Sequence, residues 1–161
     1  MALAGIGVDM VEIARMEKTL ERRPSFKTRI FTEEEIAYCE RMAKPSKHYA
    51  ARFAAREAVL KALGTGFTRG IGVRDVSVAR GEAGRPEAVL SGRAAEIAEE
   101  LGVREVAISL SYTSDVAVAN AVAVTDEVKP APPAKKEQKE DLRASFRAAR
   151  SIINELERGD E

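Results

Sequence analysis

Two charged side chains on one predicted helix are the first candidates for chemistry in this sequence. Segment 52–66 reads RFAAREAVLKALGTG, and residues four apart on a helix lie on the same face. Glu57 and Lys61 are therefore neighbours, and the segment ends in a turn with Gly64 and Gly66, where a ligand can approach the backbone closely. A phosphate and metal site fits this pattern. A solvent-exposed helix with a Glu57–Lys61 ion pair and a glycine cap fits it too.

A lone acid near the N-terminus is the second candidate. Residues 3–8 form a short apolar run typical of a buried strand, and Asp9 follows at its end. An unpaired carboxylate in a low-dielectric environment is costly, so Asp9 needs a helix to cap, a counter-charge or a metal ion. A helical pattern begins near Met10, and capping it is the simplest of these roles.

Composition limits the classes of protein that fit. The chain has 161 residues, of which 45% are hydrophobic and 32% charged, as expected for one globular domain with a modest core. Its 26 basic and 26 acidic residues balance, so we expect neither nucleic acid nor a membrane as a partner. The single cysteine, Cys39, lies in a helical pattern, and we expect it to be packed rather than reactive. No secretory pattern is visible, and we expect a cytoplasmic protein.

Helices and strands alternate along the sequence and must position the candidate residues. Turn formers at 81–86 and 113–115 each connect two strands as a hairpin, and Thr32 and Glu35 have the spacing of a capping box. Prolines 24 and 45 end the helices before them. The predicted helices are 11–22, 32–42, 48–63 and 92–101, and the predicted strands are 3–8, 73–79, 87–90, 106–111 and 116–124. Helices with a largely antiparallel sheet predict an α+β fold.

The sequence changes character after residue 125. We expect a domain at 1–125, a stiff linker rich in proline and lysine at 126–140, and an amphipathic helix at 141–158. The apolar stripe of that helix consists of Leu142, Phe146, Ala149, Ile153 and Leu156. The stripe must be covered by the chain's own core, a second subunit or another protein. The tail is therefore expected to serve assembly or solubility rather than chemistry.

Three segments together resemble a known protein family. Residues 5–9 read GIGVD, residues 31–39 read FTEEEIAYC, and the long motif at 52–66 follows. This combination resembles the holo-acyl-carrier-protein synthases, the short class of 4′-phosphopantetheinyl transferases, from about residue 3 to residue 125. The resemblance implies a phosphopantetheinyl transferase-like fold and a role in fatty acid biosynthesis. It implies transfer of 4′-phosphopantetheine from coenzyme A to a serine of apo acyl carrier protein, releasing adenosine 3′,5′-bisphosphate.

The resemblance also implies roles for individual residues. Asp9 and Glu57 would bind Mg²⁺, which prefers a few carboxylates together with waters and phosphate oxygens. Lys61 would meet a phosphate, and Glu57 would take the serine proton, so these three are the expected catalytic residues. The expected coenzyme A contacts are Arg52, Lys61, Gly64, Thr65, Gly66, Pro86, Ser111, Tyr112 and Thr113.

Recognition of the carrier protein is expected on the first helix. Arg15 corresponds to a basic residue that meets the acidic helix of the carrier protein, although a solvated helix face beside Glu12 would look the same. The family typically assembles as a homotrimer with sites between subunits. Asp9 and Glu57 then need not share a subunit surface with Arg52.

The sequence departs from the family pattern near its end. The family usually has Ser-His-Thr followed by an aromatic residue, whereas Tyr112 occupies the histidine position and Val116 the aromatic position. A tyrosine hydroxyl donates one hydrogen bond but carries no positive charge, so the phosphate contact is either weaker or rebuilt. The only histidine, His48, is expected in the first turn of the motif helix.

Three functions of different classes are compatible with these observations. An active transferase is favoured because both acids and the lysine occupy their motif positions. A degenerate relative that binds coenzyme A or carrier protein without turnover would fit the change at Tyr112. A structural protein whose tail mediates assembly is the third hypothesis.

Overall fold

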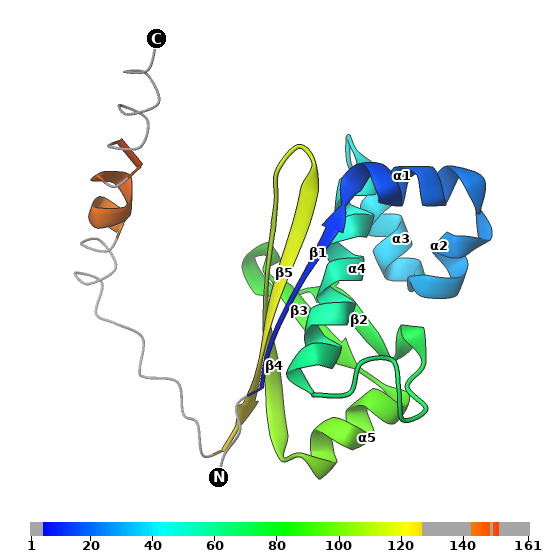
Figure 1. Cartoon of the computed structure of the whole chain (residues 1–161), viewed down its shortest axis with the longest axis vertical. Coiled ribbons are helices and arrows are strands. Elements are labelled where there is room, and N and C mark those ends of the chain that lie inside the picture. The colour runs from blue at the N-terminus through cyan, green and yellow to red at the C-terminus, as the bar shows by residue number, and fades with distance from the viewer. Residues whose placement is uncertain (1–4, 127–142, 149, 152–161) are drawn as a thin grey trace. The chain divides into compact units, whose positions relative to one another are not determined.

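The computed structural model describes residues 5–126, 143–148 and 150–151, in two units that comprise 1–129 and 130–161. The first unit has the α+β fold predicted from the sequence (Figure 1). Its elements are β1 (Ile6–Glu12), α1 (Ile13–Arg22), α2 (Ser25–Ile30), α3 (Glu33–Glu40), α4 (Pro45–Ala62), the 3-10 turn η1 (Val73–Asp75), β2 (Val76–Arg80), the 3-10 turn η2 (Glu82–Gly84), β3 (Pro86–Leu90), α5 (Gly92–Glu100), β4 (Val103–Tyr112) and β5 (Val116–Thr125).

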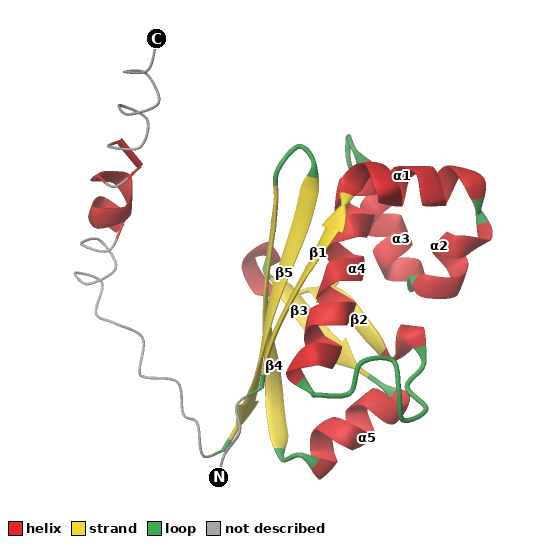
Figure 2. Ribbon diagram, in the orientation of Figure 1, coloured by secondary structure: helices red, strands yellow, loops and turns green. Residues whose placement is uncertain are grey.

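Two antiparallel sheets organise this unit. The larger sheet has the strand order β1-β5-β4, and β2 pairs with β3 in a separate hairpin. Figure 2 shows the helices α1 to α5 gathered on one side of the larger sheet, with α4 alongside β1. Alanines at alternate positions of β5, from Ala117 to Ala123, are buried on the helical side. Small side chains there let α4 pack close to the sheet.

Two glycines bring β1 into direct contact with the backbone of α4. A Cβ atom on Gly7 would lie 1.9 Å from the carbonyl oxygen of Ala58, and one on Gly5 would lie 1.7 Å from that of Ala62. No side chain fits at these distances, so only glycine allows this approach. Because side chains alternate along a strand, Asp9 projects from β1 on the same side as Gly5 and Gly7, toward α4.

A buried ion pair connects α4 to two other elements. Both terminal nitrogens of Arg56 donate to the Glu35 carboxylate, with an Nη1–Oε1 distance of 3.0 Å. The Val78 amide of β2 donates to the same carboxylate at 2.9 Å, and the Thr32 amide donates to it at 2.9 Å. Glu35 also completes the predicted capping box with Thr32. Both charged side chains are almost fully buried, and the sequence analysis did not identify this pair.

Several local expectations differ from the structure. Strand β1 continues to Glu12 because its residues pair with β5, so Asp9 lies within the strand and caps no helix. Pro24 ends α1 as predicted, but it is followed directly by the unpredicted helix α2. The interpretation of the 48–63 region as a solvent-exposed helix is wrong, because most residues of α4 are buried in the core. Cys39 is fully buried, as expected.

The second unit is described only in part. Residues 143–148 and 150–151 are helical, and Phe146 of the predicted stripe is 66% exposed. The other stripe residues, Leu142, Ala149, Ile153 and Leu156, lie outside the described residues, as does most of the predicted linker. Among the helices that the structure describes, none is both long and apolar enough to cross a membrane.

The Gly7→Ala substitution tests the contact between β1 and α4. The added methyl group would overlap the Ala58 carbonyl oxygen, and we expect the free energy of unfolding to fall by about 3 kcal/mol in urea titrations. Gly72→Ala is the control, because the new Cβ would meet only the movable Asp75 side chain and should cost about 1 kcal/mol or less. Equal stability of the wild type and the Gly7 variant would contradict the packing described here.

Candidate active site

Asp9, Glu57 and Lys61 meet where β1 crosses α4. The Lys61 ammonium donates to Asp9 Oδ1 at 2.8 Å and to the Val8 carbonyl oxygen at 3.0 Å. The partner of Lys61 is therefore Asp9 on β1. The spacing in the sequence had suggested Glu57 instead, one helical turn away on α4. The Asp9 side chain is only 17% exposed and is therefore partly desolvated. Lys61 compensates the negative charge of Asp9 in this position.

The electrostatics of this cluster favour an additional cation. Burial raises the pKa of Glu57, the nearby Asp9 carboxylate raises it further, and Lys61 partly opposes the change. The hydrogen bond to Asp9 raises the pKa of Lys61. One ammonium thus faces two carboxylates, and the ionised form of Glu57 is penalised in the free protein. A cation placed between the two carboxylates would offset that penalty.

A cavity of about 640 Å³ opens beside these acids, between β1, α1 and α4. Asp9 and Glu57 line it together with the rim residue Arg15. The remaining lining residues are Met10, Val11, Glu12, Met16, Thr19, Phe26 and Phe53. The site is therefore an open cleft whose lining combines acidic side chains, the basic Arg15 and apolar side chains.

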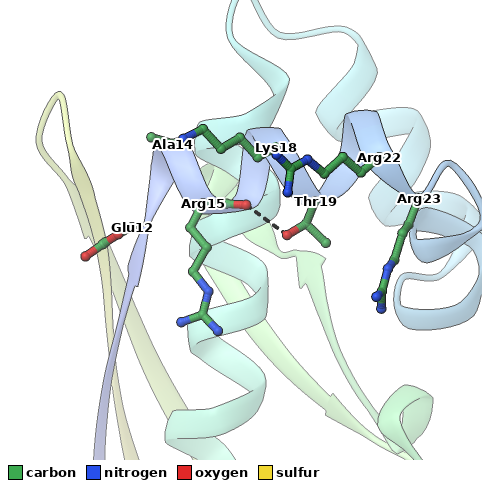
Figure 3. A pocket seen from close by; sticks show the side chains of 7 residues that line it. All are labelled: Glu12, Ala14, Arg15, Lys18, Thr19, Arg22 and Arg23. Carbon is green, nitrogen blue, oxygen red and sulfur yellow. Dashed lines mark hydrogen bonds between the residues drawn. The ribbon is translucent and has the colours of Figure 1, made fainter.

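Basic side chains follow the exposed face of α1 beyond this cleft. Arg15, which is exposed, also lines a neighbouring hollow of about 480 Å³ with Lys18, Arg22 and Arg23. Figure 3 shows these side chains along the helix, with Arg15 and Arg23 extending to the same side. The sequence analysis identified Arg15 alone. The spacing of Arg15, Lys18 and Arg22 on one helix was a signal that could have identified the others.

Three other predicted contacts lie in a different cavity. Arg52, Pro86 and Tyr112 line a hollow of about 150 Å³. His48 and Arg80 line it too, and neither was among the predicted site residues. Five positions on a helix correspond to about 140° of rotation, so Arg52 and Glu57 face different sides of α4. Within one chain, the structure does not bring these three residues to the acids.

The glycine-rich exit of α4 ends the helix. Gly64 and Gly66 have φ values of +71° and +56°, a region that favours glycine. The amide and the hydroxyl of the buried Thr65 both donate to the Leu60 carbonyl oxygen, at 3.0 and 3.3 Å. Positions 64–66 line none of the three cavities described above. Their backbone is nevertheless open, since a Cβ on either glycine would meet no atom within 4 Å.

The last two predicted contacts flank Tyr112. Ser111 is exposed and, because side chains alternate along a strand, projects from the face of β4 opposite to that of Tyr112. The Thr113 hydroxyl accepts hydrogen bonds from the amides of Asp115 and Val116, both at 3.1 Å, and so stabilises the β4–β5 turn. Neither residue lines the 150 Å³ cavity.

Comparison with known proteins gives consistent results. Residues 5–121 match a family described as the 4′-phosphopantetheinyl transferase superfamily. A holo-acyl-carrier-protein synthase of Caldanaerobacter subterraneus subsp. tengcongensis is 44% identical over 122 residues, which cover 76% of this chain and 95% of the relative. One of Moorella thermoacetica is 44% identical over 116 residues, which cover 72% of this chain and 90% of that protein.

Solved structures of holo-acyl-carrier-protein synthases resemble the fold of this chain. The holo-acyl-carrier-protein synthase of Neisseria meningitidis superposes with a TM-score of 0.68 at 34% identity, covering 75% of this chain and 98% of that one. The enzyme of Helicobacter pylori in complex with coenzyme A gives a TM-score of 0.65 at 29% identity, covering 74% of this chain and 99% of that one.

Proposed function

The chain belongs to the 4′-phosphopantetheinyl transferase superfamily as a holo-acyl-carrier-protein synthase, and on that premise we propose that Asp9, Glu57 and Lys61 are its catalytic centre. The reaction proposed there is Mg²⁺-dependent and releases adenosine 3′,5′-bisphosphate. The observation that carries the proposal is the convergence of two carboxylates and one ammonium at the β1–α4 contact, beside an open cleft.

The donor set suits magnesium. Asp9 and Glu57 supply hard carboxylate oxygens, and in the described part of the chain no group of three or more histidine, cysteine or acidic side chains could form a full protein cage. Magnesium commonly takes one or two carboxylates and fills its remaining positions with water and phosphate oxygens. When bound there, it would offset the negative charge of the coenzyme A pyrophosphate.

Each residue then has a distinct task in the transfer. Lys61, already fixed by Asp9 and the Val8 carbonyl, supplies a positive charge to a phosphate of the leaving group. Glu57 accepts the serine proton as the general base. The serine oxygen bonds to the phosphorus that carries pantetheine, and the bond from that phosphorus to the bridging oxygen breaks. Adenosine 3′,5′-bisphosphate leaves with the bridging oxygen.

The basic face of α1 is the proposed contact for apo acyl carrier protein. Arg15 lies at the edge of the acidic cleft, and Lys18, Arg22 and Arg23 extend the positive charge along the helix. A carrier protein that presents an acidic helix would therefore be guided to place its serine at the cleft.

We further propose that three chains assemble through the outer face of the larger sheet. Ile6, Val8, Met10 and Val122 project there and are 72%, 48%, 67% and 38% exposed. Apolar side chains gathered on one strand face typically mark an interface. Assembly would allow the cavity containing Arg52, Pro86 and Tyr112 to complete the acidic cleft of a neighbouring copy. Predicted coenzyme A contacts on different faces of one chain would then meet in one site.

The catalytic assignment is tested by mass spectrometry of apo acyl carrier protein after incubation with coenzyme A, Mg²⁺ and the enzyme. The wild type is expected to add one phosphopantetheine group. Asp9→Asn and Glu57→Gln should each lower kcat at saturating Mg²⁺ by about 100-fold, since each removes a carboxylate ligand. The exposed Glu99→Gln on α5 is the control and should be fully active. Unchanged turnover in either site variant would refute the assignment.

The role of Arg15 is tested by charge reversal. Arg15→Glu should raise KM for apo acyl carrier protein about tenfold at low salt and flatten its dependence on ionic strength. Kinetics with coenzyme A as the varied substrate should change little, because Arg15 lies at the rim of the cleft. Equal losses for both substrates would argue for a role in the chemistry instead.

Sedimentation equilibrium tests the assembly. The wild type should sediment at three times the 17.5 kDa chain mass. Ile6→Asp should shift the protein toward monomer and reduce transfer with it, because a charge is then placed on the apolar face. The control is Val89→Asp, a 44% exposed position on β3 outside that face, which should leave the mass unchanged. A monomeric, fully active wild type would exclude sites shared between chains.

A further inference from the structure

Two consecutive residues in the first turn of α4 contact Tyr112, the residue at the position where the family pattern has histidine. The Lys47 ammonium lies 4.8 Å from the centroid of the Tyr112 ring. The His48 ring packs edge-on against Tyr112 and also against Tyr38, each with a centroid distance of 5.6 Å. These two ring contacts of His48 support the Tyr112 ring beneath Lys47.

The surroundings of this stack are strongly cationic. The cavity beside it is lined by Arg52 and Arg80, and none of its ten lining residues is acidic. The Arg52 guanidinium is already placed, since it stacks 3.9 Å from the centroid of the Tyr38 ring. A phosphate monoester carries up to two negative charges and three acceptor oxygens, and it is the chemical group that such a set of cations recognises best.

The charge required for that recognition must come from lysine and arginine. Burial lowers the pKa of His48, and Arg52 and Lys47 lower it further, so the charged form of the imidazole is disfavoured. The tyrosine side chain at position 112 brings no positive charge. Lys47, which lies over the tyrosine ring, therefore adds a positive charge at the end of β4 to those of Arg52 and Arg80.

We propose that Lys47 is a specificity residue that pairs with the ribose 3′-phosphate of coenzyme A, and that His48 positions Lys47 by packing against the Tyr112 ring. This inference rests on the proposed transferase function. It accounts for the loss of histidine at position 112, because a cation from α4 is placed over the tyrosine that replaces it. The residues involved come from the first turn of α4 and the last residue of β4, which the fold brings together.

The decisive comparison uses coenzyme A and 3′-dephospho-coenzyme A as donors with apo acyl carrier protein and the full chain. Lys47→Met keeps the length of the side chain and removes the charge. It should raise KM for coenzyme A about tenfold with little change in kcat, whereas KM for the dephospho donor should change less than about twofold. Lys47→Arg should restore most of the preference for coenzyme A, because the charge returns.

Two further variants separate positioning from folding. His48→Ala should raise KM for coenzyme A about threefold, and His48→Phe, which keeps an aromatic ring against Tyr112, should recover part of that loss. Arg74→Met is the control for charge alone, because Arg74 is exposed and belongs to η1 rather than to the first turn of α4 or the end of β4. It should leave both KM values unchanged.

The inference is overturned if Lys47→Met affects both donors equally or affects neither. Its failure can be distinguished from failure of the proposed function by isothermal titration, which needs no turnover. Adenosine 3′,5′-bisphosphate should bind Lys47→Met about tenfold more weakly than it binds the wild type, while adenosine 5′-monophosphate should bind both equally. An inactive wild type that still shows this difference would refute the transferase proposal and retain the 3′-phosphate site.

Discussion

The contact of β1 with the backbone of α4 is the constraint on which the rest of the site depends. Gly5 and Gly7 leave no room for a side chain, so strand and helix are in van der Waals contact. Asp9, two residues beyond Gly7 on the same strand face, is thereby brought within hydrogen-bonding distance of Lys61. With larger residues at the glycine positions the strand would move outward, and the carboxylate would lose its counter-charge while still partly buried.

Helix α4 carries functional residues on more than one side because it is the core of the domain. One side packs on the alanines of β5 and presents Glu57 and Lys61 at the edge of the sheet. Another side holds Arg56 in the buried pair with Glu35, which also fixes β2. Breaking such a pair leaves a buried charge without a partner and typically costs several kcal/mol. The β2–β3 hairpin, which supplies Pro86, is therefore held firmly against the helix.

The separation of the proposed donor contacts has a simple geometric origin. Arg52 and Glu57 belong to one motif, but five residues of helix rotate their side chains to different faces. The acidic cleft and the cationic hollow are consequently distinct cavities of one chain. An apolar sheet face that remains exposed in the single chain gives a physical reason for copies to associate. In the proposed assembly, the acidic cleft of one copy would meet the cationic hollow of another.

Local patterns in the sequence determined much of this protein. The capping box at Thr32, the antiparallel hairpins, the glycine exit of α4 and the motif containing Glu57 and Lys61 depend on short-range spacing, and they occur as predicted. The motif also identified the family. Strand and helix periods are properties of neighbouring residues, which explains why these features could be predicted from one sequence.

Only the tertiary structure decided which partners these residues have. Lys61 pairs with Asp9, 52 positions away, rather than with Glu57, four positions away. The reason is that Gly5 and Gly7 let β1 pack directly on α4, which places Asp9 within reach of the Lys61 side chain. The same holds for Arg56 and Glu35, for the extension of β1 past Asp9, and for the contact of Lys47 with Tyr112. Contacts between distant segments depend on how closely surfaces fit, and that information is absent from any single window of sequence.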